Sequence, residues 1–508
     1  MARRCQPYQH QITGKITYQL VRPGDNPLTA APLPPIMKRY EALAETLAAD
    51  IRNGSLPPGT RLPSIRKTVA QYGVSPSTAF QAYYRLEERG LVRARERSGY
   101  YVAGPARREL PQPQARPSRQ VSTPVDISKL VFAVLEGARD RELVQFGSAF
   151  PSPELFPWER LGKSLARAGR ALDPWYSVND LPPGNAALRR QIALRYLGAG
   201  APQPAEDLVV TNGALEALNL CLMAVTQPGD VVAIESPGFY ASLQALERLR
   251  LKAVEIPVDP AEGIDLGALD TALSRHPVKA CWFMTQFQNP LGASMSEDKK
   301  KALVALLARH QVPLIEDDVY GELYFGNRCP LPAKAFDTHG LVMHCSSFSK
   351  TLAPGFRIGW VAPGRFGEAI QRLKLMTTLS AGVPTQVALA EYLQHGGYDK
   401  QLRKLRHVLE MQQGRMIDAI GQHFPEEVRV SRPEGGYFLW VEFAAGFDAL
   451  ALHHAALEAG IGIAPGPIFS ARQGYRNCIR LNYGHLWNED AEAAVATLGR
   501  LIAEQQAG

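Results

Sequence analysis

Residues 347–360 have the sequence SFSKTLAPGFRIGW, and the fold of most of this 508-residue chain is inferred from them and from the segments around them. Lys350 completes an S-x-x-K motif that begins at Ser347, and Arg357 follows seven residues after the lysine. The motif alone is a weak indication, because unrelated serine hydrolases share it and because most lysines simply lie on a surface. Its meaning therefore depends on the rest of the chain.

Short β-branched runs on either side of this segment alternate with helical stretches, which predicts an α/β domain with a mainly parallel sheet. Five segments with unusual side chains lie at or near such runs: TNGAL at 211–215, SPGFY at 236–240, QNPLG at 288–292, IEDDVY at 315–320 and CIRLN at 478–482. Each also has an ordinary interpretation. In the same order, these are a strand-to-helix connection, a core aromatic residue, a turn, a metal site and an arginine that reaches solvent.

Taken together and in this order, the segments resemble the pyridoxal phosphate (PLP) site of fold-type I aminotransferases, over roughly residues 145–503. The resemblance implies a large α/β domain of that fold with a small C-terminal α+β subdomain. It also implies that Lys350 forms a Schiff base with PLP and that Asp317 lies beneath the pyridine nitrogen, where a carboxylate favours the pyridinium. Arg480 is implied to bind the carboxylate of an amino-acid-like ligand in a two-pronged geometry.

The other contacts that the resemblance implies surround the same cofactor. Asn289 and Tyr320 are implied to bond to its phenolic oxygen, and Phe239 to stack on its ring. The phosphate is implied to lie at a helix N-terminus among hydroxyl and guanidinium donors, which suit a dianion; these residues are Gly213, Ala214, Leu215, Ser347, Ser349 and Arg357. No metal is expected.

The family places a phosphate-binding tyrosine of the partner subunit in this site, which implies a homodimer. In this chain Asn179 aligns with that position, and Tyr176 lies nearby. The sequence therefore leaves this contact unassigned.

Residues 39–102 have a different character. Apolar residues every four positions predict a helix from Arg39 to Asn53. Ser64 and Ser75 are predicted N-caps of two further helices, and the runs beside Leu91 and Tyr100 predict a short hairpin. Three helices and a hairpin in this order predict a winged helix-turn-helix. The segment 62–102 resembles the GntR family of bacterial DNA-binding domains.

A recognition helix needs short polar residues at its N-terminus, and basic residues are needed to contact phosphates. The predicted DNA-binding residues are Arg66, Ser75, Ser77, Thr78, Gln81, Arg95, Arg97 and Gly99, although any single arginine here could equally belong to a solvated face. Pro76 and Phe80 occupy positions that are often arginine in the GntR family. The sequence preference of that family is therefore not transferred to this chain.

The charge of the chain supports this division. Residues 1–124 hold 19 Lys and Arg against 8 Asp and Glu, whereas the remainder holds 37 against 41. All of the net charge of +7 therefore comes from the first quarter, as expected of a segment that binds a polyanion. We expect a tail over 1–35, the DNA-binding domain over 36–104, a proline-rich linker over 105–125 and the PLP-binding domain over 126–508.

Other classes of protein are disfavoured by the sequence. No apolar run approaches the ~20 residues of a membrane span, and the six cysteines form no C-x-x-C pair, so we expect a cytoplasmic protein with reduced thiols. Gly162-Lys163-Ser164 resembles the end of a phosphate-binding P-loop. Pro157 stands where the first glycine of that motif would be required, which makes nucleotide hydrolysis a poor interpretation.

A GntR-type domain, a linker and an aminotransferase-like domain in this order resemble the MocR family of PLP-dependent transcription regulators. The leading hypothesis is a regulator that binds operator DNA as a homodimer and senses a small amino compound through PLP. The alternative is an active aminotransferase with an accessory DNA-binding domain, because Lys350 and Arg480 are both present.

Overall fold

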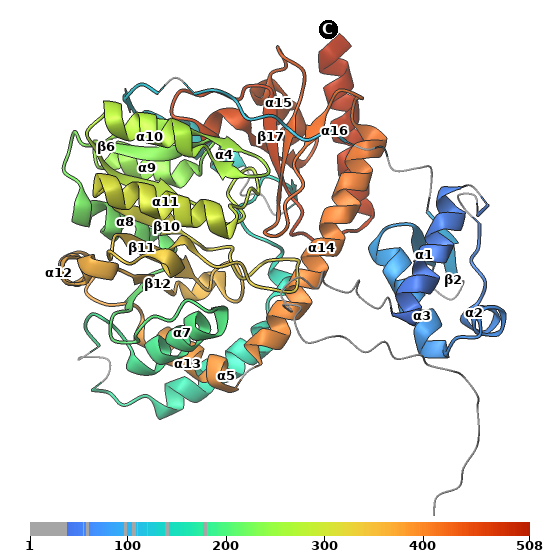
Figure 1. Cartoon of the computed structure of the whole chain (residues 1–508), viewed down its shortest axis with the longest axis horizontal. Coiled ribbons are helices and arrows are strands. Elements are labelled where there is room, and N and C mark those ends of the chain that lie inside the picture. Colours follow the sequence, from blue (N-terminus) through green and yellow to red (C-terminus); the bar gives the residue numbers. More distant parts are fainter. Residues whose placement is uncertain are drawn as a thin grey trace, which may run out of the picture. The chain divides into compact units, whose positions relative to one another are not determined.

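The chain forms two compact units (Figure 1). The computed structural model describes residues 38–53, 55–56, 60–95, 99–103, 108, 110–118, 120–137, 142–175, 180–395 and 397–507. The first unit comprises residues up to Glu87 together with Leu91–Ala103, and the second comprises Glu88–Gly90 together with the chain from Gly104 onward. Each unit is described by itself. No helix in these described ranges is both long and apolar enough to cross a membrane.

The N-terminal unit is a winged helix-turn-helix, as its sequence predicts. It contains α1 (Arg39–Arg52), α2 (Ile65–Tyr72), α3 (Pro76–Glu88), β1 (Val92–Arg95) and β2 (Gly99–Val102). The two strands form an antiparallel hairpin in which Val92 faces Val102.

Local sequence signals set the ends of its helices. The Ser64 hydroxyl accepts a hydrogen bond from the Lys67 backbone N–H, and the Ser75 hydroxyl accepts one from the Thr78 N–H. Gly73 ends α2 in the left-handed conformation, with φ of +62°, which glycine adopts without strain. The predicted caps are therefore confirmed.

A small apolar core holds the three helices and the hairpin together. Its buried members include Leu43, Leu47, Leu86 and Val102. Tyr83 of α3 adds a polar contact, because its hydroxyl donates to the Pro63 carbonyl at 2.7 Å and lies 2.6 Å from the Thr68 hydroxyl. This contact fixes the start of α2 against α3.

The second unit is built on a nine-stranded sheet in which five neighbouring strands are parallel. The strand order is β3-β7-β6-β9-β10-β11-β12-β5, with β8 beside β7. The strands are β3 (Thr123–Pro124), β5 (Val209–Thr211), β6 (Val231–Ser236), β7 (Lys252–Asp259), β8 (Gly263–Ile264), β9 (Val278–Phe283), β10 (Leu314–Asp317), β11 (Val342–Ser347) and β12 (Gly359–Ala362). Strands β6 and β11 are buried along their whole length, as expected of a sheet covered by helices.

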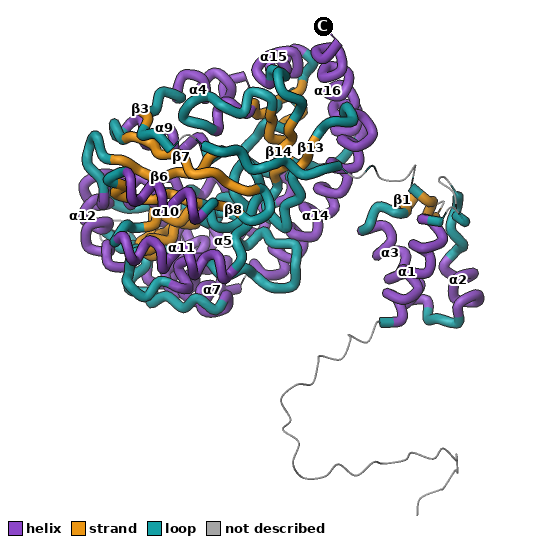
Figure 2. Tube along the Cα trace, turned by 45° about the horizontal axis from the view of Figure 1, so that its top comes forward, coloured by secondary structure: helices purple, strands orange, loops and turns teal. Residues whose placement is uncertain are grey.

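Helices surround this sheet (Figure 2). They are α4 (Ser128–Gly137), α5 (Trp158–Ala171), α7 (Ala186–Ala199), α8 (Ala214–Val225), α9 (Tyr240–Arg248), α10 (Leu266–Arg275), α11 (Glu297–His310), α12 (Gly367–Thr377) and α13 (Val383–His395). Short 3₁₀ turns lie at Pro153–Leu155, Ala333–Phe336, Pro354–Phe356, Gly364–Phe366 and Gly466–Phe469. Because β6, β9, β10 and β11 are parallel, their carboxyl ends meet at one edge of the sheet, which is where ligands of α/β folds bind.

The C-terminal subdomain is an α+β layer beside that sheet. A four-stranded sheet has the order β13-β14-β17-β16, and the short β4 pairs with β15. The elements are β4 (Val144–Gln145), α14 (Tyr398–His423), β13 (Arg429–Val430), β14 (Phe438–Glu442), α15 (Ala449–Glu458), β15 (Ile461–Gly462), β16 (Ala464–Pro465), β17 (Cys478–Asn482) and α16 (Glu489–Ala507). The fold class predicted from the sequence is confirmed.

The linker differs from the semi-extended tether that its composition suggests. The described residues between 108 and 125 lie along the second unit, and Leu110 is buried in the core of the C-terminal subdomain. The proline-rich chain is held by hydrogen bonds to residues far away in the sequence, which composition does not reveal.

Candidate functional site

Lys350 lies in the turn that follows β11. Its Nζ donates a hydrogen bond to the Ala149 carbonyl at 2.7 Å and sits 3.6 Å from the centre of the Phe150 ring. Burial lowers the pKa of Lys350 to about 7, the Arg480 guanidinium acts in the same direction, and Asp317 opposes both. The amine is therefore substantially uncharged near neutral pH, which is the form that attacks a carbonyl.

Asp317 ends β10 with 1% of its surface exposed. Neither of its carboxylate oxygens completes a hydrogen bond of normal geometry in the described chain, although the Trp282 indole and the Val319 N–H act on Asp317 to lower its pKa. Burial raises the pKa of Asp317 to about 7, and the neighbouring Asp318 adds to the effect. A buried carboxylate without a donor is unfavourable, so this position suits a ligand that brings an N–H group or a positive charge.

Arg480, in β17, is the buried cation of the site. It donates to Asn289 Oδ1 at 3.0 Å and to the carbonyls of Gly147 and Ser148 at 2.6 and 3.2 Å. Its Nε and the amide nitrogen of Asn289 are buried without partners. The hydrogen bonds of Arg480 in the described chain go to one amide oxygen and two backbone carbonyls, none of which is a carboxylate. Burial lowers the pKa of Arg480. A guanidinium in this state is suited to an anionic ligand.

Tyr320 is buried near the Arg480 guanidinium. The Tyr320 and Tyr437 rings meet edge to face, with a centroid distance of 5.3 Å. Burial raises the pKa of Tyr320 well above its usual range, so its hydroxyl stays protonated. Phe239 is the residue immediately before α9, and its ring centroid lies 4.9 Å from that of Tyr240. Its proposed stacking on the cofactor ring stays a prediction.

The predicted phosphate cradle is a tight arrangement of backbone and guanidinium. Arg357 donates to the Ser349 hydroxyl at 3.3 Å and to the Asn212 carbonyl at 3.2 Å. Gly213 precedes α8 with φ of +83°, and a Cβ atom there would lie 2.4 Å from Arg357 Nη2. Only glycine fits at this point. Ser347 is also buried here, and its hydroxyl accepts from the Ser349 N–H at 3.3 Å.

The other two residues of the predicted cradle differ in exposure. Ala214, the first residue of α8, is buried, whereas Leu215 is 47% exposed. Their backbone N–H groups belong to the first turn of the helix, where donors are free to bind an anion.

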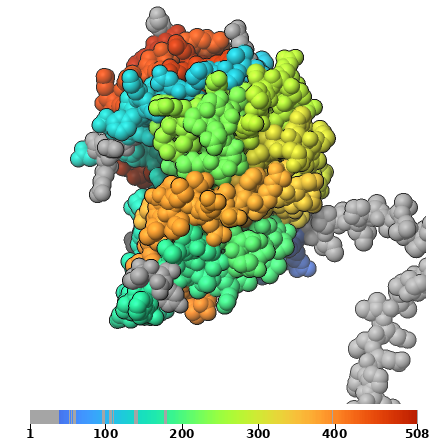
Figure 3. Space-filling view, turned by 90° about the vertical axis from the view of Figure 1, so that its left-hand side faces the viewer, coloured from blue at the N-terminus to red at the C-terminus, as the bar shows by residue number. Residues whose placement is uncertain are grey.

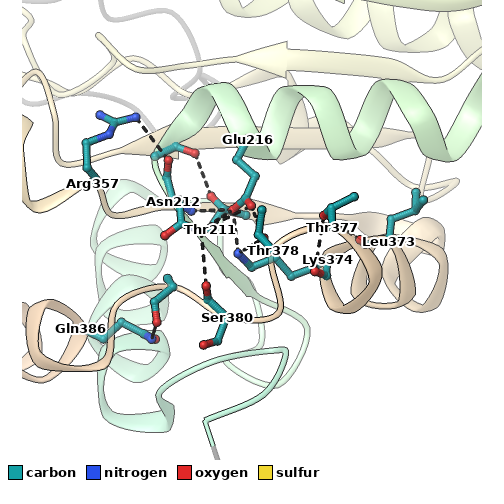
Figure 4. Close-up of polar contacts among 12 residues, drawn as sticks. Thr211, Asn212, Glu216, Arg357, Leu373, Lys374, Thr377, Thr378, Ser380 and Gln386 are labelled. Atoms are coloured by element: carbon teal, nitrogen blue, oxygen red, sulfur yellow. Dashed lines mark hydrogen bonds and ion pairs between the residues drawn. The ribbon is translucent and has the colours of Figure 1, made fainter. Parts of the chain in front are cut away.

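A buried ion pair supports the cradle, and it was not predicted from the sequence (Figure 4). Glu216 accepts from the Asn212 backbone N–H at 2.6 Å and pairs with Lys374 at 2.8 Å, while Thr378 also donates to it. Glu216 accepts a hydrogen bond from the N–H of Asn212, and Arg357 donates one to the carbonyl of Asn212. The backbone of Asn212 is therefore held at both of its polar groups. No short motif marks Lys374, which reaches the site from α12, more than 150 residues along the chain.

Residues 147–150 are a second feature that was not predicted. Their carbonyls accept hydrogen bonds from Lys350 and Arg480, and Tyr437 also donates to the Ala149 carbonyl at 3.0 Å. A Cβ at Gly147 would lie 2.8 Å from the Ile463 backbone, so the segment packs closely against the C-terminal subdomain. In the sequence, only Gly147 and the prolines that follow it indicated an irregular segment here.

Two other features of the sequence have clear outcomes. Gly162-Lys163-Ser164 lies inside α5, where Lys163 pairs with Glu159, so this segment is not a phosphate-binding loop. Asn179 and Tyr176, the candidates for the partner-subunit contact, lie outside the described residues.

The groups that lack partners match the functional groups of PLP. Asp317 offers a buried acceptor for the pyridine N–H, and Asn289 offers a free donor for the phenolic oxygen. Arg357 lies against the Gly213 turn, where a phosphate would find guanidinium and backbone donors, and Lys350 has the amine that the cofactor requires. The residues present therefore fit this cofactor.

In the N-terminal unit, the outward face of α3 presents polar residues. Ser75, Ser77 and Gln81 are exposed, and hydrogen bonds of 2.8 Å join the Ser75 hydroxyl to those of Ser77 and Thr78. Phe80, on the same face, is 55% exposed. The buried face of the helix is apolar apart from one hydroxyl and consists of Ala79, Ala82, Tyr83 and Leu86, which leaves the polar face available to DNA.

Arg66 and Gly99 are the other predicted DNA-binding residues that the structure describes in full. Arg66 is exposed in the first turn of α2, and Gly99 begins β2 with φ of +105°. The backbone of Arg95 ends β1, while its side chain and the whole of Arg97 lie outside the described residues.

Comparisons with known proteins agree with both units. A model of the aminotransferase class I and II family matches residues 179–498, and a model of the gntR family of bacterial regulatory proteins matches residues 39–102. The chain is 50% identical over 469 residues to the uncharacterized HTH-type transcriptional regulator YdcR of Escherichia coli (strain K12), covering 92% of this chain and 100% of that protein. It is 30% identical over 375 residues to aromatic-amino-acid aminotransferase 1 of Thermococcus litoralis, covering 72% of this chain and 89% of that enzyme.

Solved structures resemble the second unit. The α-aminoadipate aminotransferase LysN of Thermus thermophilus, complexed with N-(5′-phosphopyridoxyl)-L-leucine, matches with a TM-score of 0.68 and 29% identity, over 74% of this chain and 95% of that one. The fold and the site thus define a fold-type I aminotransferase-like domain joined to a GntR-type winged helix-turn-helix. The chain belongs to the aminotransferase class I and II family and, by its two domains, to the MocR family of transcription regulators.

Proposed function

We propose that this chain is a DNA-binding transcription regulator whose aminotransferase-like domain binds PLP and senses an amino acid or another small amine. The observation that carries the sensing half is the set of buried groups without partners, on Asp317, Asn289 and Arg480, beside a lysine with a lowered pKa. These buried polar groups lie in one region of the fold and lack hydrogen-bond partners there. This is expected where a bound ligand supplies the missing partners.

The DNA-binding half is supported by the exposed polar face of α3, the hairpin beside it and the excess positive charge of the first 124 residues. Arg66, Ser75, Ser77, Thr78 and Gln81 are proposed to contact operator DNA. Relatives that match over nearly the whole chain carry the description of transcription regulators, which is consistent with this proposal.

Each residue of the site has a defined task toward the cofactor. PLP, when bound, supplies an electrophilic carbon and an electron-withdrawing ring that primary amines can react with. Lys350 would hold it through its amine, Asp317 would accept a hydrogen bond from the pyridine N–H, and Asn289 would donate one to the phenolic oxygen. Arg357, which donates to the Asn212 carbonyl, and the start of α8 would hold the phosphate.

The amine ligand is proposed to be recognised through its carboxylate. Arg480 is free to exchange its bonds to the backbone carbonyls of Gly147 and Ser148 for bonds to a carboxylate of the ligand. A charged acceptor forms a stronger hydrogen bond with a guanidinium than a neutral carbonyl does. We also propose a homodimer, which would bring a partner subunit to the phosphate site.

Operator binding tests this function. DNA upstream of the chain's own gene, offered in a gel shift with competitor DNA, is expected to give a specific complex whose affinity changes when PLP and an amine are added. A matched fragment from inside the coding region serves as the control. Equal affinity for both fragments, with or without PLP, would contradict the proposal.

An active aminotransferase is a second candidate, favoured by the presence of the complete set Lys350, Asp317 and Arg480 and by the likeness to aminotransferases of known substrates. Steady-state turnover with panels of amino acids and 2-oxo acids distinguishes the two. Sustained turnover of ~1 s⁻¹ or more would support an enzyme, whereas a single slow half-reaction would support the regulator.

A further inference from the structure

Helix α3 exposes a large aromatic side chain on the side that faces away from its own core. The buried residues of this helix recur at the spacing of a single helical face. A second set of residues has the same spacing, is exposed on the opposite side and consists of Ser77, Phe80, Gln81 and Tyr84. We call these four residues the outer face of α3. Phe80 is 55% exposed, more than any other large hydrophobic residue of the described N-terminal unit.

Exposed hydrophobic residues of the second unit have a different setting. Leu215 on α8 and Leu375 and Met376 on α12 are exposed, and the two helices are joined by the Glu216–Lys374 ion pair beside the predicted phosphate cradle. Figure 3 shows α12 in the orange band across the middle of this face. The proposed homodimer would bring a partner subunit to this surface. Phe80 belongs to the other compact unit, so its exposure needs a separate explanation.

A single exposed aromatic residue is ordinary on a protein surface, so the position of Phe80 on α3 matters more than its exposure. One turn earlier, the Ser75 hydroxyl accepts from the Thr78 backbone N–H at 3.1 Å and lies 2.8 Å from the hydroxyls of Ser77 and Thr78. Part of the hydrogen-bonding capacity of these hydroxyls is therefore already used within the helix. Phe80 and Gln81 are the next side chains of the outer face.

Gln81 is available for a hydrogen-bonded contact with a base. Its side chain is exposed and forms no hydrogen bond within the described residues. In the major groove, a glutamine amide matches adenine, because it donates to N7 and accepts from the N6 amino group. Adenine pairs with thymine, so a contact of this kind places a thymine close to the outer face of α3.

The ring of Phe80 needs an apolar group as its partner on DNA. Thymine presents a 5-methyl group in the major groove, whereas the other groups that bases offer there are hydrogen-bond donors and acceptors. Phenylalanine has no donor for a phosphate or for the edge of guanine. Packing its ring on a methyl group removes apolar surface from water, which corresponds to about fourfold in affinity for each methyl group.

We propose that Phe80 recognises thymine in the operator by packing its ring on the 5-methyl group in the major groove. This inference rests on the proposed function, because it requires that α3 enter the major groove as a recognition helix does. Gln81, the neighbouring residue of the outer face, then contacts adenine. The operator is therefore expected to contain A·T pairs under this part of the helix.

Uracil-substituted DNA tests the contact, because uracil differs from thymine only in lacking the 5-methyl group. The upstream fragment is prepared once with thymine and once with uracil throughout, and the affinity of the full chain for each is measured by fluorescence anisotropy. The ratio of the two affinities is the readout. For the wild type, thymine DNA is expected to bind about fourfold more tightly if one methyl group is contacted, and about 15-fold if each half of a dimer's site has one.

Phe80→Ala is expected to lower this ratio to about 1, by weakening binding to thymine DNA toward the level of uracil DNA. This variant is expected to fold, because Phe80 is exposed and alanine is favourable inside a helix. Phe80→Leu keeps an apolar side chain and is expected to keep part of the ratio. Gln81→Ala, on the same face, is the matched control and is expected to weaken binding to both DNAs while keeping the full ratio.

The possible failures differ in what they show. A wild-type ratio near 1, or an unchanged ratio in Phe80→Ala, would mean that Phe80 contacts no thymine methyl group, although the proposed function stands. If Phe80→Ala changes the oligomeric state in sedimentation and keeps the ratio, the outer face of α3 is an interface between copies of the chain, and the inference is wrong. If the wild type forms no specific complex with the thymine fragment, the proposed function fails and the inference fails with it.

Discussion

The lowered pKa of Lys350 has a direct consequence for cofactor loading. Only the uncharged amine attacks the aldehyde of PLP, and the pKa of about 7 means that this form dominates above neutral pH. The rate at which visible absorbance of bound PLP appears is therefore expected to rise with pH through about 7 and then level off. Lys350→Ala is expected to give no such absorbance.

The effect of Asp317 on the pKa of Lys350 can be tested in the same loading experiment. Because the Asp317 carboxylate raises the pKa of Lys350, Asp317→Asn is expected to move the midpoint to lower pH. Lys163→Ala, at an exposed lysine of α5, serves as the control and is expected to load normally. A wild-type midpoint near the usual lysine value of about 10.4 would show that the amine is not buried as described.

Arg66 tests the DNA-binding unit at the scale of one residue. If this exposed side chain contacts a phosphate, Arg66→Ala is expected to weaken binding to all sequences and to reduce the slope of log affinity against log salt by about 1. Fluorescence anisotropy at several salt concentrations measures both. Arg170→Ala, in the other unit, is the control, and an unchanged slope for Arg66→Ala would remove this residue from the interface.

At the scale of elements, the turn between β5 and α8 depends on Gly213. A Cβ atom there would collide with Arg357, and the positive φ adds strain, so Gly213→Ala is expected to weaken PLP binding by about tenfold or more. Gly229→Ala is a close control, because Gly229 also has a positive φ but has open space around its Cα. Titration of PLP by absorbance compares the two variants. Equal affinities would show that the cradle does not hold the phosphate.

The contact between α2 and α3 makes a similar prediction for the DNA-binding unit. Tyr83→Phe leaves the buried Thr68 hydroxyl and the Pro63 carbonyl without their partner, which is expected to cost about 1–3 kcal/mol of local stability. Hydrogen exchange of the α2 amides measures this free energy in the full chain. Tyr100→Phe, which removes a hydroxyl from the β2 strand of the same unit, is the matched control and is expected to cost less.

Local signals explain which elements were predictable. Ser64, Gly73 and Ser75 set helix ends by contacts within four residues, so the winged helix-turn-helix follows from its own sequence. The carboxyl ends of parallel strands meet at one edge of the sheet, so Asp317 at the end of β10 and Lys350 just after β11 lie at the same edge.

The unpredicted features depend on contacts between distant residues. Lys374 pairs with Glu216 from another helix. Residues 147–150 are held at the site by the pairing of β4 with β15 and by hydrogen bonds from Asn482. Proline content suggested a free linker, whereas Arg108 and Arg116 attach it to residues more than 300 positions away. No local pattern contains this information, because the partners are set by the packing of the whole unit.

At the scale of the whole molecule, the two units differ in fold, and the first 124 residues differ in charge from the rest of the chain. The basic first quarter suits a polyanion, and the remainder carries a slight excess of acid. A chain that only catalysed transamination would need no such unit, whereas a regulator needs both the DNA-binding face and a ligand site that influences it. The central claim is therefore the coupling between the PLP site and DNA affinity.

One measurement tests that coupling most directly. The affinity of the full chain for its upstream DNA is determined with and without PLP, for the wild type and for Lys350→Ala. We expect PLP to change the affinity of the wild type by ~5-fold or more and to leave that of Lys350→Ala nearly unchanged. The same affinity for the wild type in both conditions, with PLP shown by absorbance to be bound, would contradict the account.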